Sequence, residues 1–189
     1  MKNNNGDTET ELIERVKKGD TSAFRLIVEK YKDVSFSLAY SILRNEHDAE
    51  DALQESFIKV YNNLNRFHSN SSFSTWLYRI VVNTCFTFIK KHKKSQLLIN
   101  IDTVTDIAID PCENGIEKLI SSERSAIINK VLDTIKPDEA LLLRLYYLAE
   151  QDLSEIMNIT GFKESKIKVT LFRARKNILK ELKKYLLPN

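Results

Sequence analysis

Apolar residues recur every three or four positions along most of the 189-residue chain, which is the spacing of one face of an α-helix. A first short helix is expected to stop at Gly19 and Asp20, and Thr21 is expected to cap the second helix. The second helix continues to a break near Arg44 and Asn45. The apolar positions of these two helices are Leu12, Ile13, Val16, Ala23, Phe24, Ile27, Tyr31, Phe36, Leu38, Ala39, Ile42 and Leu43.

Two further helices are predicted on either side of a polar loop at residues 66–72. The third helix runs from about Glu46 to Leu64, and its buried stripe contains Ala49, Ala52, Leu53, Phe57, Val60 and Leu64. Ser72 or Ser74 can cap the fourth helix, which reaches a lysine cluster near Lys90. These segments predict one compact helical domain over residues 1–95.

Residues 96–120 have no sustained period and contain Asp110-Pro111 and Gly115, so they are interpreted as a linker. Helical spacing returns in residues 121–189 with the stripe of Ile127, Ile128, Val131, Leu132 and Ile135, and then with Leu141, Leu142 and Leu145 after a break at Lys136-Pro137. The predicted fold class is therefore all-α, with two small helical domains joined by a flexible acidic linker.

The second domain contains a helix-turn-helix pattern. Residues 154–160 predict a short helix that ends at Gly161, where glycine accepts a positive φ. A second helix begins near Lys163 or Glu164, with Ile167, Leu171, Ala174 and Ile178 facing inward. A plain αα-hairpin with a solvated basic face is the alternative interpretation.

Composition and charge narrow the function. Apolar residues make up 42% and charged residues 29% of the chain, and Gly and Pro are scarce, which is typical of a globular helical protein. No apolar run approaches a membrane span and the polar N-terminus lacks a signal-peptide core, so a cytoplasmic protein without direct membrane insertion is expected. Cys85 and Cys112 are expected to be incidental thiols, and His47, His68 and His92 lack ligand spacing.

Basic residues gather in two separate clusters. Lys90, Lys91, Lys93 and Lys94 form the first, and residues 163–184 hold nine basic side chains against two acidic ones. The segment between the clusters is acidic, with Asp102, Asp106, Asp110, Glu113 and Glu117. Two basic clusters that flank an acidic spacer favour two contacts with a polyanion such as DNA.

Three segments resemble bacterial RNA polymerase sigma factors of the sigma-70 family, in the order in which that family carries them. Residues 48–61 (DAEDALQESFIKVY) resemble the core-polymerase-binding region 2.2, residues 73–84 (FSTWLYRIVVNT) resemble regions 2.3 and 2.4, and residues 153–175 are similar to region 4.2. The length leaves no room for the further domains of primary sigma factors, and this resembles the extracytoplasmic-function group. Trp76 stands where primary sigma factors carry two adjacent tryptophans, which implies weaker promoter melting.

The resemblance implies three sets of site residues. Core polymerase would be bound by Asp48, Asp51, Gln54, Glu55 and Lys59. The melted −10 element would be read by Phe67, Ser69, Asn70, Phe73, Trp76, Arg79, Asn83, Lys90 and Lys91. The −35 duplex would be read by Lys163, Ser165, Lys166, Lys168, Val169, Phe172, Arg173 and Lys176.

The implied partners are core RNA polymerase, through the coiled coil of its largest subunit and its flap, promoter DNA, and an anti-sigma factor, for which a membrane-anchored form is one option. No cofactor, metal or catalytic residue is expected. Two other classes stay open at this point: a stand-alone helix-turn-helix regulator and a helical enzyme. The region 2.2-like helix argues against a repressor, and the sequence carries no P-loop, nucleophile elbow or zinc-protease motif.

Overall fold

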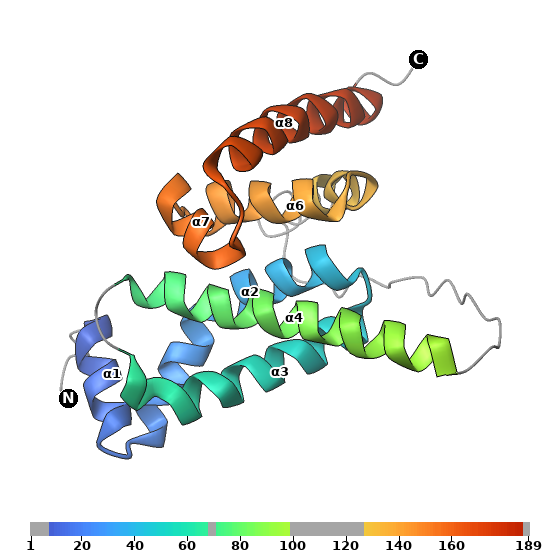
Figure 1. The fold of residues 1–189 in the computed structure, drawn as a ribbon. Helices are drawn as coiled ribbons and strands as arrows, with labels where there is room; N and C mark the ends of the chain where they lie inside the picture. Colours follow the sequence, from blue (N-terminus) through green and yellow to red (C-terminus); the bar gives the residue numbers. More distant parts are fainter. Residues whose placement is uncertain (1–7, 68–70, 99–126, 187–189) are drawn as a thin grey trace, which may run out of the picture.

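The computed structural model describes residues 8–67, 71–98 and 127–186, and within these ranges the regular elements are helical. The N-terminal group contains α1 (Glu9–Lys17), α2 (Thr21–Leu43), α3 (Glu46–Asn63), a short 3₁₀ turn (Leu64–Arg66) and α4 (Phe73–Leu98). The C-terminal group contains a helical stretch at 127–134, α6 (Pro137–Leu143), a π-helical turn (Arg144–Leu148), α7 (Leu153–Thr160) and α8 (Glu164–Leu186). In Figure 1, α6, α7 and α8 lie above the layer that α2 and α4 form.

Polar side chains fix where the N-terminal helices begin. Asp20, not Thr21, caps α2: its carboxylate accepts hydrogen bonds from the backbone N–H groups of Ser22 and Ala23, and Thr21 is already helical. The prediction for Thr21 was therefore wrong by one residue. Together with the hydroxyl of Ser22 and the guanidinium of Arg15, these bonds lower the pKa of Asp20 to about 2.

The predicted breaks between helices are present for local reasons. Arg44 ends α2 in the left-handed conformation with φ of 55°, and the Asn45 side chain then caps α3. Ser72 caps α4, because its Oγ accepts the N–H of Thr75 at 3.2 Å. α4 itself runs past Lys90 to Leu98, further than the lysine cluster suggested.

The buried stripes agree with the sequence pattern in most places. Ala49, Ala52, Phe57, Val60 and Leu64 of the predicted α3 stripe are buried, and Leu53 is partly buried against the core. Cys85 is also buried, and burial raises the pKa of its thiol to about 12. Cys112 and the acidic linker lie outside the described residues.

The main departure from the predicted core is in the C-terminal group. Ile128 was assigned to the buried stripe but is 47% exposed, because the helical stretch turns only Val131, Leu132 and Ile135 inward. α6 is followed by a π-helical turn, which the sequence pattern did not predict. None of the helices in the three described ranges is long and apolar enough to cross a membrane.

Candidate nucleic-acid interface

α7 and α8 form the predicted helix-turn-helix. α7 begins with a reciprocal capping box between Asp152 and Glu155 and ends at Gly161, which has a φ of 71°. Ile167, Leu171 and Ala174 of α8 are buried, so packing fixes which face of α8 remains outside. The geometry matches a recognition helix whose outer face is free to enter a groove.

The outer face of α8 holds the residues assigned to −35 DNA. Phe172 is 70% exposed and Val169 is 49% exposed, which is unusual for side chains of this type unless a partner covers them. Lys168 pairs with Glu164 at 2.6 Å, and the ammonium of Lys166 lies 3.3 Å from the centre of the Phe162 ring. The remaining residues of the predicted set are all exposed: Lys163, Ser165, Arg173 and Lys176.

Aromatic residues at the start of α4 pack around Trp76. The Trp76 ring lies 5.3 Å from Phe67 and 5.8 Å from Phe73, measured between ring centroids. Phe67 and Phe73 are themselves buried, so in this arrangement they support the Trp76 ring and do not present their own faces to a ligand. Ser69 and Asn70 of the predicted set lie outside the described residues.

Trp76 and Asn83 both line a cleft between α3 and α4, which has a volume of about 510 Å³. Lys59, predicted to bind polymerase, lies in this cleft, where its ammonium contacts Thr84 Oγ1 at 3.1 Å and Glu55 at 2.6 Å. The other lining residues are Asn63, Arg66, Ile80, Thr84 and Thr87.

Asn63 and Arg66 were not identified from the sequence. The signal that could have found them is their spacing, since they follow Lys59 by four and seven residues and so continue its helical face. Arg79, Lys90 and Lys91 are exposed on α4 but do not line the cleft. The cleft therefore combines an aromatic ring, amides, hydroxyls and cations, which are the groups that bind single-stranded nucleic acid.

The acidic residues assigned to polymerase binding lie along α3. Asp51 and Gln54 are exposed, while Asp48 and Glu55 are partly covered by the side chains of α4 and of α3 itself. The ion pair with Lys59 lowers the pKa of Glu55. Ile58 is 61% exposed one turn beyond Gln54, and this apolar position was not predicted. Acidic and apolar side chains thus share the outer face of α3, which suits a protein partner.

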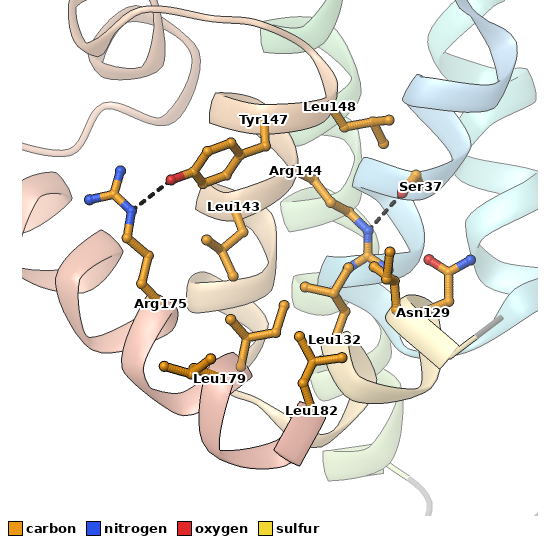
Figure 2. Close-up of a pocket in the computed structure, with 12 residues that line it drawn as sticks. Ser37, Asn129, Leu132, Leu143, Arg144, Tyr147, Leu148, Arg175, Leu179 and Leu182 are labelled. Atoms are coloured by element: carbon orange, nitrogen blue, oxygen red, sulfur yellow. Dashed lines mark hydrogen bonds between the residues drawn. The ribbon is translucent and has the colours of Figure 1, made fainter. Parts of the chain in front are cut away.

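A third surface is the groove of about 760 Å³ between the helical stretch at 127–134, the π-helical turn and α8 (Figure 2). Its walls are mainly apolar, but two guanidinium groups reach it. Arg144 Nε donates to Ser37 Oγ at 2.7 Å, and Arg175 Nε donates to Tyr147 Oη at 2.8 Å, as the dashed lines in Figure 2 show. Arg175 therefore faces Tyr147 and lies apart from the predicted −35 set.

Within the described ranges, no three His, Cys, Asp or Glu side chains are grouped closely enough to hold a metal ion together. Two histidine side chains lie near carboxylates of α3. His47 lies 3.7 Å from Asp51, and His92 lies 3.6 Å from Asp48. Both contacts lie at the surface and contribute little to stability.

Comparison with known proteins shows the family. Residues 27–95 match the Sigma-70 region 2 model. The chain is 33% identical to the ECF RNA polymerase sigma factor SigW of Bacillus subtilis over 178 residues, which cover 90% of this chain and 95% of SigW. It is 36% identical to the ECF RNA polymerase sigma-E factor of Haemophilus influenzae over 185 residues, which cover 90% of this chain and 93% of that protein.

Two solved structures share the fold. CnrH, in complex with the cytosolic domain of CnrY, matches with a TM-score of 0.62 and 18% identity over 93% of this chain and 97% of CnrH. The sigma factor RpoE of Bartonella quintana, in complex with the anti-sigma factor NepR, matches with a TM-score of 0.69 and 21% identity over 85% of this chain and 96% of RpoE. The full-length identity to the curated relatives and the matched region 2 lead to one conclusion: this chain belongs to the ECF sigma factors of RNA polymerase.

Proposed function

We propose that the chain binds core RNA polymerase and directs it to promoters by reading −35 duplex with α8 and melted −10 DNA with the cleft between α3 and α4. The two DNA surfaces have different chemistry, and this difference supports the division of labour. α8 offers a convex helix face with cations and exposed apolar side chains, which fits a major groove. The cleft offers Trp76 and Asn83 beside Lys59, which fits unstacked bases and their phosphates.

The observation that carries the −10 assignment is the placement of Trp76 and Asn83 in the same cleft as Lys59 and Arg66. Stacking on an aromatic ring contributes about 1–3 kcal/mol per base. An amide can both donate to and accept from a base edge, and the two cations can neutralise the neighbouring phosphates. Residues 1–95 would thus melt and hold the −10 element, residues 121–189 would hold the −35 element, and residues 96–120 would connect them.

Polymerase binding is assigned to the outer face of α3. Asp51 and Gln54 are exposed there, and Ile58 adds an apolar contact next to them. Buried apolar contacts surrounded by polar ones are typical of protein interfaces. The coiled coil of the largest polymerase subunit is the proposed partner of this face, and an anti-sigma factor is the proposed regulator, as NepR is for the B. quintana neighbour in its complex.

A stand-alone helix-turn-helix regulator would use α8 alone and bind operator duplex without polymerase. The present proposal instead predicts that specific initiation requires core polymerase. Reconstituted run-off transcription on a library of genomic promoters tests this directly. Transcripts that start at a shared −35 and −10 motif, only when the chain and core enzyme are both present, are the expected result. Tight sequence-specific duplex binding by the free chain, with no effect on transcription, would support the regulator instead.

A further inference from the structure

The groove between the helical stretch at 127–134, the π-helical turn and α8 belongs to none of the surfaces assigned above (Figure 2). None of its described lining residues is in the −10, −35 or polymerase-binding sets. Its volume of about 760 Å³ lies within the roughly 300–1,000 Å³ that is typical of small-molecule sites. Such sites are mainly apolar and hold a few polar groups that orient the ligand, and this groove has the same composition.

The apolar wall of the groove is open to solvent. Ile128 is 47% exposed, Leu148 is 50% exposed and Leu179 is 57% exposed, and all three line the groove. Ile178 and Leu182 of α8 continue the same wall. A folded protein seldom gathers this many large apolar side chains in one exposed patch unless a partner or a ligand covers them. Hydrocarbon is therefore expected to form most of the molecule that binds here.

Arg144 brings a buried positive charge to this apolar groove. The side chain is 3% exposed, and its Nε donates to Ser37 Oγ at 2.7 Å. Its Nη1 atom is buried and has no hydrogen-bond partner in the described part of the chain. The hydroxyl of Ser37 is uncharged, so it accepts one hydrogen bond without neutralising the guanidinium. Because buried donors and buried charges are normally paired, Arg144 lacks an anionic acceptor.

The charged neighbours of Arg144 leave this deficit in place. Burial is the largest cause of the lowered pKa of Arg144, and the positive charge of Arg44 lowers the pKa further. Asp133 acts in the opposite direction, but its carboxylate already pairs with Arg44 at 2.8 Å. These three side chains carry two positive charges and one negative charge. One positive charge beside the groove is thus uncompensated, and a ligand with a single negative charge would balance it.

The chemistry of the site favours a carboxylate as that negative group. A guanidinium presents its N–H donors in a planar fork, which matches the geometry of a carboxylate. A phosphate ester carries about −1.5 to −2 charges at pH 7 and would leave excess negative charge in an apolar groove. Arg175, the other guanidinium at the groove, already donates to Tyr147 Oη at 2.8 Å. Arg144 is therefore the side chain that lacks a partner and would hold the carboxylate.

We infer that this groove binds an unbranched fatty acid, with the carboxylate at Arg144 and the hydrocarbon chain along Ile128, Leu179 and Leu182. The inference goes beyond the proposed function, because the site contacts neither the DNA surfaces nor the outer face of α3. Since the Nη1 atom of Arg144 is buried, the side chains that cover it must shift slightly as the carboxylate enters. The binding free energy is then divided between an ion pair at one end of the ligand and apolar contacts along the rest.

Isothermal titration calorimetry of the full chain tests the two parts of the ligand separately. The probes are decanoate, decanol and hexanoate, each at concentrations where it is monomeric in solution. Decanoate is expected to bind at least about tenfold more tightly than decanol, because only the carboxylate forms a charged pair with Arg144. Hexanoate is expected to bind at least about tenfold more weakly than decanoate, because each fully buried methylene strengthens binding about fourfold.

Three variants locate the site. Arg144→Gln removes the charge and keeps a donor for Ser37, so it should abolish the preference for decanoate over decanol. Leu179→Asp places a negative charge in the apolar wall and should weaken decanoate at least about tenfold, and folding should be kept because Leu179 is 57% exposed. Leu26→Asp is the matched control, since Leu26 is 50% exposed on α2 and does not line the groove. It should bind all three probes as the wild-type chain does.

Two results with the wild-type chain would overturn the inference: no binding of decanoate, or equal binding of decanoate and decanol. Equal binding would show an apolar face without an anion site, as expected for a surface that a helix of a protein partner covers. Equal weakening by Leu179→Asp and Leu26→Asp would place the ligand elsewhere and would also overturn it. If Arg144→Gln did not fold, the decanoate and decanol comparison would still decide the role of the charge, and the two leucine variants would still decide the location.

Discussion

Arg144 donates from Nε to Ser37 Oγ at 2.7 Å, which links the π-helical turn of the C-terminal group to α2 of the N-terminal group. Arg144 is 3% exposed, and its Nη1 atom is buried without a hydrogen-bond partner. Burial lowers the pKa of Arg144 to about 10, although the nearby negative charge of Asp133 acts in the opposite direction and raises it. Ser37 is thus one of few groups that compensate a buried cation in this interface.

Ser37→Ala should therefore lower the free energy of unfolding by about 1–2 kcal/mol, because the guanidinium loses a compensating acceptor. This loss of stability cannot exceed the free energy with which the N-terminal and C-terminal groups pack together, because separating them returns Arg144 to water. Ser35→Ala is the control: Ser35 Oγ is buried without a partner, so its removal should be neutral or slightly stabilising. Urea unfolding of both variants measures the difference, and equal losses would contradict the prediction.

Charge reversal at Asp51 should weaken binding to core polymerase about tenfold, which corresponds to about 1.4 kcal/mol. Ile58→Ser should have a comparable effect, because Ile58 is 61% exposed on the same face of α3. Neither change should alter the melting temperature much, since exposed side chains contribute little to stability. Glu14→Lys on α1 reverses an exposed charge on another helix and serves as the control. Titration with labelled core enzyme is the measurement, and unchanged affinity in both variants would exclude this face.

Asn83→Ala should reduce open-complex formation by about fivefold, or about 1 kcal/mol, through loss of a hydrogen bond to a melted base. Asn83 is exposed in the cleft beside Trp76, so folding and −35 recognition should be unchanged. Permanganate footprinting and run-off transcription over −10 variants measure melting and base preference. Asn62→Ala is the matched control, because Asn62 is exposed on α3 but does not line the cleft. Wild-type melting and preference in Asn83→Ala would remove it from the site.

Arg173→Ala and Lys176→Ala should have different effects on −35 DNA, although both side chains are exposed on α8. A base-edge contact by Arg173 would contribute about 1–3 kcal/mol and carry sequence preference. A phosphate contact by Lys176 would change affinity evenly across sequences and lower the salt dependence. Holoenzyme binding to a set of −35 variants at several salt concentrations separates the two. A uniform loss in both variants would show that these roles are wrongly divided.

Stability should fall as pH rises from 10 to 12. Burial raises the pKa of Tyr78 to about 12, and Tyr31 is shifted in the same direction by burial and by Glu9. The folded chain keeps these protons at a pH where an unfolded tyrosine, with a pKa of about 10, has lost its proton. The contribution of Tyr78 is therefore complete below pH 10 and is lost as pH approaches 12, and the contribution of Tyr31 begins to fall over the same range.

Tyr78→Phe should flatten part of this pH dependence, by roughly 2–3 kcal/mol over the two pH units. Tyr61→Phe is the control, because Tyr61 is 40% exposed. Urea midpoints measured from pH 9 to pH 12 give the slopes. An identical slope in Tyr78→Phe and the wild-type chain would show that burial of Tyr78 does not govern alkaline unfolding.

The sequence by itself determined the helices, most of their buried stripes and the turn of the helix-turn-helix. These features depend on periodicity and on caps within a few residues, such as Asn45, Ser72 and Gly161. The family-like segments also depend only on local order along the chain. The error at Thr21 was one residue, because Asp and Thr are both common N-cap residues and the carboxylate of Asp20 is the group that caps α2.

Only the tertiary structure decided which polar groups meet across the fold. It placed Lys59 in the same cleft as Trp76 and Asn83, left Ile58 and Ile128 exposed, and buried Arg144 against Ser37. It also brought Glu155 to Thr75, 80 positions away in the chain. A helical period states which face of a helix is apolar, but not which helix covers that face. The choice of neighbour depends on how side chains from distant segments fit and compensate each other's buried polar groups, and no local pattern contains that information.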